Sequence, residues 1–316
     1  MKLIIWFGVG LGNLIGNHTH GLHQAIAQID EKVSHGWREL LASFKEEPSH
    51  LLDKPRGEDH ADGDDVLLNL RMSFISVCPV ENILGMKCVC SRKYKEVTIV
   101  RGKQEDSLAL VAAKPATKQI IVSYRPTMTL NNWITDADYT LVQLEGAPQG
   151  VKIHHGFHEY FKDIQPQTLK AALKLLQDTR FADYRLHVTG YSLGASIAII
   201  SAHSWDSFLG ENNLDHPLEV FSYSGPRPGN ELFAKYVAHL PITRYTNNND
   251  LVPHLPPRSL GFTHAGYEFH LEKDHLIPCS TNYDEDPSCA LKNKSPLSFA
   301  RHYFPDGKPI PSPPYC

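Results

Sequence analysis

The fold is decided by the stretch VTGYSLGA at residues 188–195, in which a serine has a glycine two positions away on either side. Residues 184–189 alternate as a strand does, and residues 192–205 are rich in small and apolar side chains, as a buried helix is. A strand that enters a helix through so sharp a turn strains its central residue, and glycine at 190 and 194 removes the neighbouring clashes. We therefore predict that the Ser192 hydroxyl is exposed beyond the carboxyl end of a strand.

The pattern G-x-S-x-G in a strand-turn-helix context is the nucleophile elbow of the α/β-hydrolases. In this turn the backbone N–H groups at the helix start are aimed at whatever the serine attacks. A chance glycine-flanked turn is the alternative reading of the bare motif, and the strand before it and the helix after it favour the catalytic reading.

Further strands and helices alternate along the chain. We predict strands at 96–101, 107–113, 118–124, 218–223 and 242–245, and helices at 66–77, 157–178 and 231–239. The α/β class follows, with a mostly parallel central sheet, helices on both faces, and ligands beyond the carboxyl ends of the strands.

The composition narrows the classes of function. The chain has 316 residues with 31 Lys+Arg against 35 Asp+Glu, a net charge of -4, so no polybasic face for nucleic acid is expected and a neutral substrate is favoured. No apolar run reaches the ~20 residues of a transmembrane helix. The 6 cysteines, an even number, suit an oxidising compartment, and their spacing matches no zinc site.

Two segments precede the predicted catalytic domain at 66–316. Residues 1–16 read as a signal peptide, with Lys2 before an apolar run, although a buried first strand is the alternative. Residues 17–65 read as an N-terminal extension or pro-segment, in which 22–44 has the apolar spacing of an amphipathic helix and 45–65 is an acidic linker. An ordinary surface helix is the alternative to a pro-segment.

An activated serine requires a base and a carboxylate that orients the base, and in this fold they follow in the order Ser, Asp or Glu, His. Asp250 fits the carboxylate, because it follows a predicted strand in the polar turn NNND. The base must come later, and spacing leaves these histidines open: His254, His264, His270, His275 and His302.

Four motifs occur in one order along the chain: IHHGFHEYF at 153–161, TGYSLGA at 189–195, FSYSGPRPGN at 221–230 and NNNDLVPHLPP at 247–257. This set resembles the fungal class 3 lipases, the triacylglycerol lipases of filamentous fungi and yeasts, over roughly residues 66–316. The resemblance implies the α/β-hydrolase fold with a helical lid. It assigns Ser192 as the nucleophile, Asp250 as the carboxylate and His302, in RHYF, as the base.

The same resemblance implies an oxyanion hole and a lid. Thr127, by its backbone N–H and hydroxyl, and the N–H of Leu193 are the expected oxyanion donors, and Asp136 is expected to hold the Thr127 hydroxyl. The apolar lid side chains it implies are Met128, Leu130, Trp133 and Ile134. The disulfide pairs it implies are Cys78 with Cys316, Cys88 with Cys90, and Cys279 with Cys289.

The expected activity is hydrolysis of carboxylic esters through an acyl-enzyme, by a secreted triacylglycerol lipase that meets its neutral lipid substrate at a lipid–water interface. No metal, organic cofactor or nucleic-acid partner is expected. Two alternatives stay open, a feruloyl-type or short-chain esterase on soluble esters and a non-catalytic lipid-binding homologue.

Overall fold

The computed structural model describes residues 73, 94–104, 107–126, 138–272, 275–279, 285–293, 297–298 and 302. All of them belong to the predicted catalytic domain. The predicted signal peptide at 1–16, the extension at 17–65 with its helix at 22–44, and the lid helix lie outside the described residues.

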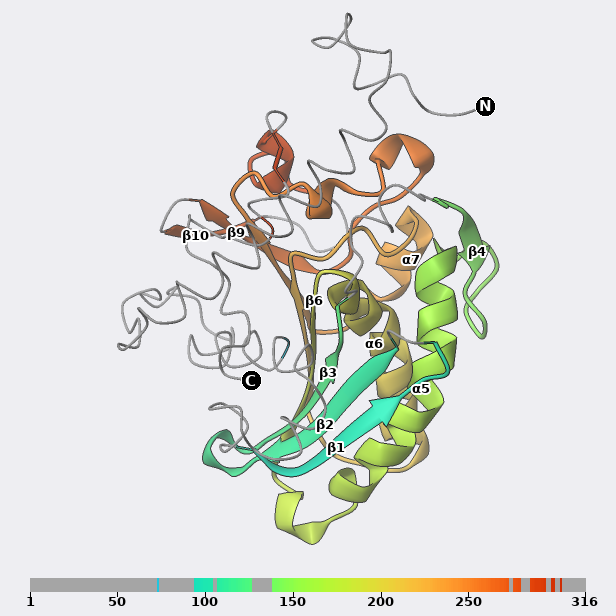
Figure 1. The fold of residues 1–316 in the computed structure, drawn as a ribbon, viewed down its shortest axis with the longest axis vertical. Helices are drawn as coiled ribbons and strands as arrows, with labels where there is room; N and C mark the ends of the chain where they lie inside the picture. Colours follow the sequence, from blue (N-terminus) through green and yellow to red (C-terminus); the bar gives the residue numbers. More distant parts are fainter. Residues whose placement is uncertain are drawn as a thin grey trace, which may run out of the picture. The chain divides into compact units, whose positions relative to one another are not determined.

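A central sheet of eight strands organises the described residues, with the order β1-β2-β3-β6-β7-β8-β9-β10 (Figure 1). Neighbours from β3 to β9 pair in parallel, whereas the pairs β1–β2, β2–β3 and β9–β10 are antiparallel. The strands are β1 (Lys95–Arg101), β2 (Leu108–Lys114), β3 (Gln119–Tyr124), β6 (Arg185–Tyr191), β7 (Leu218–Tyr223), β8 (Ile242–Asn247), β9 (Tyr267–Glu272) and β10 (His275–Pro278). Every residue of β2 and β3 is buried, which is why both read as continuous apolar runs.

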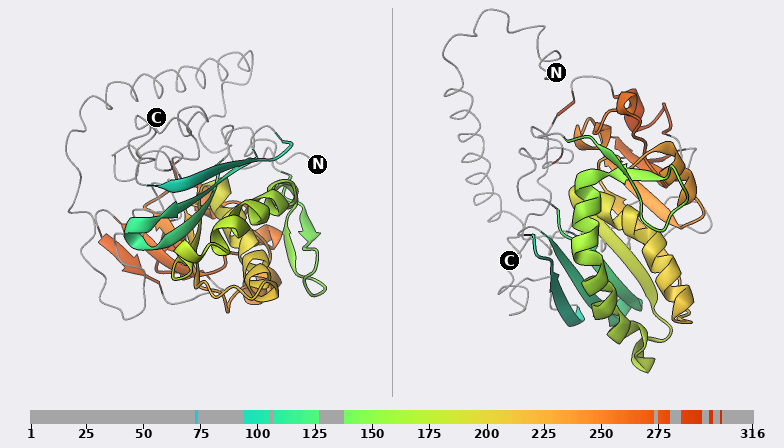
Figure 2. Two further views of the ribbon diagram at one scale, coloured as in Figure 1. Left: turned by 90° about the horizontal axis from the view of Figure 1, so that it is seen from below. Right: turned by 90° about the vertical axis from the view of Figure 1, so that its right-hand side faces the viewer.

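Helices make the crossovers that parallel strands require. Helix α5 (His155–Leu176) lies between β3 and β6 in the chain, α6 (Leu193–Glu211) joins β6 to β7, and α7 (Glu231–Tyr236) joins β7 to β8. Helices α5 and α6 pack side by side on one face of the sheet, where they bury the apolar core (Figures 1 and 2).

Smaller elements connect these parts. A two-stranded hairpin of β4 (Leu141–Gln143) and β5 (Lys152–His154) precedes α5. Short 3₁₀ turns are formed by η2 (Pro115–Thr117), η3 (Thr179–Phe181), η4 (Val252–His254), η5 (Arg258–Leu260) and η6 (Ala290–Lys292).

One described residue of the N-terminal part of the domain contacts the second face of the sheet. Val188 belongs to the core under the two helices, and because side chains alternate along a strand, Thr189 points to the opposite face. There its Oγ1 lies 3.1 Å from Oγ of Ser73, a helical residue from the segment where we predict a helix at 66–77. This contact agrees with helices on both faces.

Ser192 occupies the turn between β6 and α6 with φ 55° and ψ −126°, a strained conformation for a residue with a side chain. The predicted role of the flanking glycines is confirmed by the space around them. A Cβ at Gly190 would lie 2.1 Å from the Gly194 carbonyl oxygen, and one at Gly194 would lie 2.2 Å from the Tyr124 carbonyl oxygen. The strand order and this elbow define the α/β-hydrolase fold.

Most predicted elements are present within a few residues of their predicted ends, including every strand from β1 to β8 except the β4–β5 hairpin. Helix α5 continues through Pro166, as predicted. The hairpin and strands β9 and β10 are additions that the sequence pattern did not indicate. Within the described part of the chain, no helix combines the length and the apolar character needed to cross a membrane.

Replacing Gly194 by alanine should lower the free energy of unfolding by more than about 3 kcal/mol, because the new methyl group meets backbone atoms that cannot move aside. Gly210, in the last turn of the same helix, has no atom within 4 Å of an added Cβ. Gly210→Ala should therefore stabilise the protein by up to about 1 kcal/mol. Urea denaturation of both variants tests this, and equal effects would contradict it.

Candidate active site

Ser192 sits at the N-terminus of α6 with its hydroxyl unengaged by the described chain. Its side chain caps no helix N–H group, and its Oγ has no hydrogen-bond partner among the described residues. The prediction that this hydroxyl is exposed is wrong for the structure described, in which Ser192 is 2% exposed. Its own N–H donates to the Tyr223 carbonyl oxygen at 2.9 Å, which ties the turn to β7. The following N–H, of Leu193, is the first of α6, where the helix dipole favours a developing negative charge.

The carboxylate and the imidazole predicted for the triad lie together. His302 Nδ1 lies 2.9 Å from Asp250 Oδ2, and both side chains are 1% exposed. The second Asp250 oxygen, Oδ1, accepts the Val252 N–H at 3.0 Å, so both oxygens are engaged. A carboxylate at Nδ1 selects the tautomer that leaves Nε2 able to accept a proton.

The two partners come from segments 52 positions apart, and a backbone bridge brings them together. Asp250 forms an isolated parallel bridge with Ser298, whose N–H donates to the Asn249 carbonyl oxygen at 2.9 Å. The Ser298 carbonyl oxygen accepts the Leu251 N–H at 3.3 Å. The chain just before His302 is therefore held against the loop that carries Asp250.

Other histidines considered as the base have different environments. Nε2 of His264 lies 2.8 Å from the Pro253 carbonyl oxygen, and Nδ1 of His270 lies 2.9 Å from the Thr246 hydroxyl. Burial lowers the pKa of His254, His264 and His270. The side chain of His275 lies outside the described residues. In the described part of the chain, the imidazole hydrogen-bonded to Asp250 is that of His302.

The end of β3 lies directly against the elbow. The Tyr124 carbonyl oxygen is the atom that a Cβ at Gly194 would meet at 2.2 Å. The Arg125 N–H donates to the Leu108 carbonyl oxygen at 2.9 Å. The Tyr160 hydroxyl lies 3.0 Å and 3.3 Å from the carbonyl oxygens of Leu108 and Arg125. The chain is thus anchored two residues before Thr127. Thr127 and Asp136 themselves, and the lid residues Met128, Leu130, Trp133 and Ile134, lie outside the described residues.

A buried ion pair supports the loop that follows Asp250. Nε of Arg227 donates to Glu285 Oε1 at 2.6 Å and its Nη2 donates to Oε2 at 2.7 Å, with both side chains 3% exposed. Nη1 of the same guanidinium donates to the carbonyl oxygens of His254 and Pro256. The bidentate pair with Arg227 holds the pKa of Glu285 well below its usual range, although burial opposes the shift.

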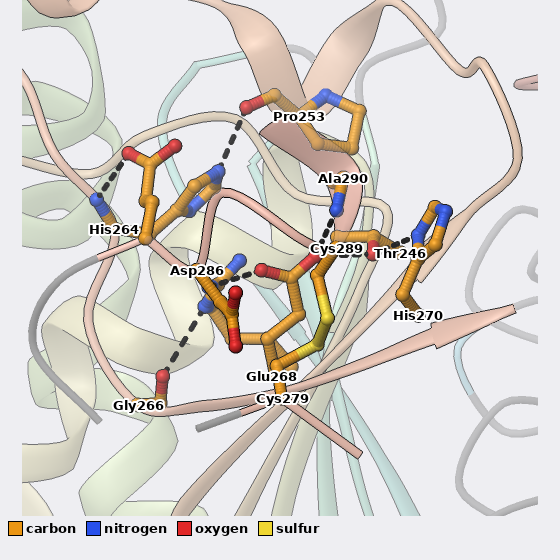
Figure 3. A network of polar contacts seen from close by, with 12 residues as sticks. Thr246, Pro253, His264, Gly266, Glu268, His270, Cys279, Asp286, Cys289 and Ala290 are labelled. Carbon is orange, nitrogen blue, oxygen red and sulfur yellow. Dashed lines mark hydrogen bonds and ion pairs between the residues drawn. A yellow bond between two sulfur atoms is a disulfide. The ribbon is translucent and has the colours of Figure 1, made fainter. Parts of the chain in front are cut away.

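A second polar cluster fixes residues 285–293 to the sheet (Figure 3). Glu268 on β9 accepts the Thr246 hydroxyl at 2.6 Å and the Ala290 N–H at 3.3 Å, and it pairs with the buried Arg244. The expected disulfide between Cys279 and Cys289 is present beside this cluster. The cysteines of the other expected pairs, Cys78 with Cys316 and Cys88 with Cys90, lie outside the described residues.

The fold is that of the α/β-hydrolases, and comparison with known sequences shows which family the chain resembles. The sequence profile "Lipase (class 3)" matches residues 121–260, which include the elbow and Asp250. Over this segment, which is less than half of the 316 residues, the chain is similar to the class 3 lipases.

Individual relatives show the same similarity. The chain is 35% identical over 168 residues to a lipase of Rhizomucor miehei, a match that covers 52% of this chain and 45% of that protein. It is 31% identical over 176 residues to secreted mono- and diacylglycerol lipase 1 of Fusarium solani, covering 54% of this chain and 50% of that protein. The matches thus span about half the length of these curated relatives.

Solved structures extend the likeness over more of the fold. The Rhizomucor miehei triacylglyceride lipase superposes with a TM-score of 0.69 at 26% identity, covering 79% of this chain and 96% of that chain. A triacylglycerol lipase described as having a serine protease triad at its catalytic centre matches with the same TM-score of 0.69 and 26% identity, over 79% and 96% of the two chains.

Several residues that support the site were not identified from the sequence. Arg227 lies in the motif FSYSGPRPGN, yet nothing in that motif indicates a partner 58 positions later at Glu285. Tyr191 appears in the sequence analysis only as a letter of the motif TGYSLGA, with no role assigned. A buried charge pair leaves no periodic signal, so spacing rules could not have found it.

Glu285→Gln should lower the free energy of unfolding at pH 7 by roughly 3 kcal/mol, because it leaves the Arg227 charge buried without its partner. The folded-state pKa of Glu285 is depressed, so its contribution is complete above the unfolded pKa of ~4.3 and is lost as pH falls. The difference between wild type and variant should therefore shrink below pH ~4.

The matched control is Glu231→Gln, which breaks an exposed i,i+4 pair with Lys235 and should change stability by less than about 0.5 kcal/mol. Chemical denaturation of the three proteins across pH tests both expectations. A difference between wild type and Glu285→Gln that did not change with pH would contradict the ionic origin of the effect.

Proposed function

We propose that the protein hydrolyses carboxylic esters with Ser192 as nucleophile, His302 as general base and Asp250 as the carboxylate that orients the base. The observation that carries the proposal is the buried 2.9 Å contact between His302 Nδ1 and Asp250 Oδ2, in a chain whose elbow leaves the Ser192 hydroxyl unengaged by described residues. These are the roles of a Ser-His-Asp triad.

In the proposed reaction, Nε2 of His302 accepts the Ser192 proton as Oγ attacks the ester carbonyl carbon. The tetrahedral oxyanion receives the Leu193 N–H and, we propose, the Thr127 backbone N–H and hydroxyl, with Asp136 holding that hydroxyl. His302 then returns the proton to the leaving alcohol. In the second half of the reaction, His302 accepts a proton from a water molecule as the water attacks the acyl-enzyme. His302 then returns this proton to Ser192 Oγ, which releases the carboxylic acid and free Ser192.

We propose acylglycerols as the substrate class and the outside of the cell as the site of action. Relatives described as triacylglyceride lipase and as secreted mono- and diacylglycerol lipase support both parts of the proposal. The net charge of -4 over 316 residues is consistent with a neutral substrate. Residues 1–16 are the proposed signal peptide, and the extension at 17–65 is proposed to cover apolar surface of the domain at 66–316.

The alternative is an esterase on soluble esters, and the proposed lid separates the two. Met128, Leu130, Trp133 and Ile134 are more apolar than a short surface helix requires. In water they would turn inward over Ser192, and at an oil surface they would turn into lipid. The free energy that an oil surface can supply to favour the open state is limited to the difference in apolar burial between the two states. We therefore expect a graded shift in population.

Ser192→Ala and His302→Ala should each reduce kcat on a p-nitrophenyl ester by at least ~1000-fold, because the members of a triad act as a unit. Ser201→Ala is the matched control. It removes a buried hydroxyl from the same helix, where Oγ donates to the Ala198 carbonyl oxygen at 2.8 Å, and activity should stay near wild type.

Thermal unfolding of each variant separates lost chemistry from lost fold. The assignment of the base would be wrong if His302→Ala kept near-normal turnover while His254→Ala or His270→Ala abolished it. A wild-type protein without esterase activity on any acyl length would favour the non-catalytic lipid-binding alternative.

For the lid, activity on a short-chain triglyceride should rise more than proportionally once the substrate exceeds its solubility. Trp133→Ala should reduce that rise, because it removes apolar surface that contacts lipid in the open state. Turnover of a soluble ester should stay within about twofold, because Trp133 is not among the proposed triad or oxyanion residues. A smooth saturation curve through the solubility limit, the same in both proteins, would instead identify a soluble esterase.

A further inference from the structure

Tyr191, the residue before the nucleophile, contacts the proposed base at two points. Its hydroxyl donates a hydrogen bond to the backbone carbonyl oxygen of His302. Its ring faces the His302 ring with the centroids 4.9 Å apart and the planes 30° from parallel. Tyr191 is 7% exposed, so both contacts lie away from solvent.

These contacts act on different parts of His302 from those that Asp250 uses. Asp250 holds the ring edge through Nδ1, which fixes the tautomer and rotation in the ring plane. The Tyr191 hydroxyl holds the backbone, and its ring lies across one face of the imidazole. Together they restrain the base on the edge, the face and the main chain, so that Nε2 keeps one direction.

The position of Tyr191 is itself fixed. It is the last residue of β6, in register with Tyr223 on β7, Tyr245 on β8 and Phe269 on β9. Within this row the rings of Tyr223 and Tyr245 are stacked at 5.1 Å, and those of Tyr245 and Phe269 at 5.6 Å. The elbow then places Ser192 one peptide unit beyond Tyr191, so the nucleophile and the support of its base move as one body.

We propose that Tyr191 is a positioning residue for the base: its hydroxyl fixes the main chain of His302, and its ring stabilises the imidazolium that forms when Ser192 is deprotonated. This inference rests on the proposed ester hydrolysis. An aromatic face near a cation stabilises it through the ring quadrupole, and more strongly in a desolvated site. Two titratable side chains that face His302 are Asp250, at Nδ1, and Tyr191, on the ring face.

The test compares Tyr191→Phe, which keeps the ring, with Tyr191→Leu, which removes the ring and the hydroxyl. Tyr191→Phe should lower kcat on a soluble p-nitrophenyl ester roughly fivefold, the worth of one hydrogen bond, with KM unchanged. Tyr191→Leu should lower kcat further. Its acid limb of kcat/KM should move about 0.5 pH unit to lower pH, because the imidazolium loses the aromatic face. In Tyr191→Phe that limb should stay in place.

Tyr245→Phe is the matched control, since it removes a hydroxyl from the same row while keeping the ring, and it should leave kcat, KM and the pH profile as in wild type. A fluorophosphonate probe reports the reactivity of Ser192 independently of the ester, and its labelling rate should fall in parallel with kcat. If Tyr191→Leu does not fold, Tyr191→Phe against Tyr245→Phe still decides the hydroxyl's role.

The outcomes separate the two proposals. A wild-type protein that neither labels nor hydrolyses any ester overturns the proposed function, and the role of Tyr191 falls with it. An active wild type in which both Tyr191 variants match Tyr245→Phe overturns the positioning role alone. A loss confined to KM, or a loss of melting temperature with unchanged kcat, also overturns it, because a packing residue would behave in that way.

Discussion

The backbone of α6 lies so close to the ends of β3 and β6 that no side chain fits between them. Hypothetical Cβ atoms at Gly190 and Gly194 would lie 2.1 Å and 2.2 Å from backbone carbonyl oxygens. This approach holds Ser192 at φ 55°, sets the direction of the Leu193 N–H and anchors the chain that leads to Thr127. The proposed nucleophile and both proposed oxyanion donors therefore depend on one contact between backbones.

The proposed carboxylate, Asp250, and the proposed base, His302, cannot be positioned in this local way, because they come from a loop after β8 and from a segment 52 positions later. Their alignment depends on buried polar contacts that act over long sequence distances. The Arg227–Glu285 pair supports the loop after Asp250, and the Ser298 bridge carries the chain toward His302. Burying a charge pair is unfavourable unless its geometry is good, and here both carboxylate oxygens are engaged by the guanidinium.

This division between local and long-range contacts explains what could be predicted from the sequence. Strands such as β3 and β6 are apolar runs with a clear period, so the fold class could be predicted from the sequence. The two glycines of the elbow lie within five residues of each other, so the turn at Ser192 could also be predicted from local sequence. Asp250 followed from its turn at a strand end. The choice of base among five histidines came from family resemblance alone, because which one reaches Asp250 depends on tertiary contacts. Strands β9 and β10 were missed because YEFHLE and HLIP mix polar and apolar residues without a clean alternation.

The proposed carboxylate and the proposed base have different physical supports. Asp250 depends on ion pairs and hydrogen bonds whose strength varies with pH, whereas His302 also lies against an aromatic row that runs across four parallel strands. The Tyr and Phe rings of this row carry no charge that changes in acid, and each ring is carried by a strand that is hydrogen-bonded to its neighbours. Acid should therefore weaken the support of the carboxylate before that of the imidazole. If the loop that carries Asp250 loosens while His302 stays in place, the imidazole loses its correct tautomer first. Its distance from Ser192 changes only later.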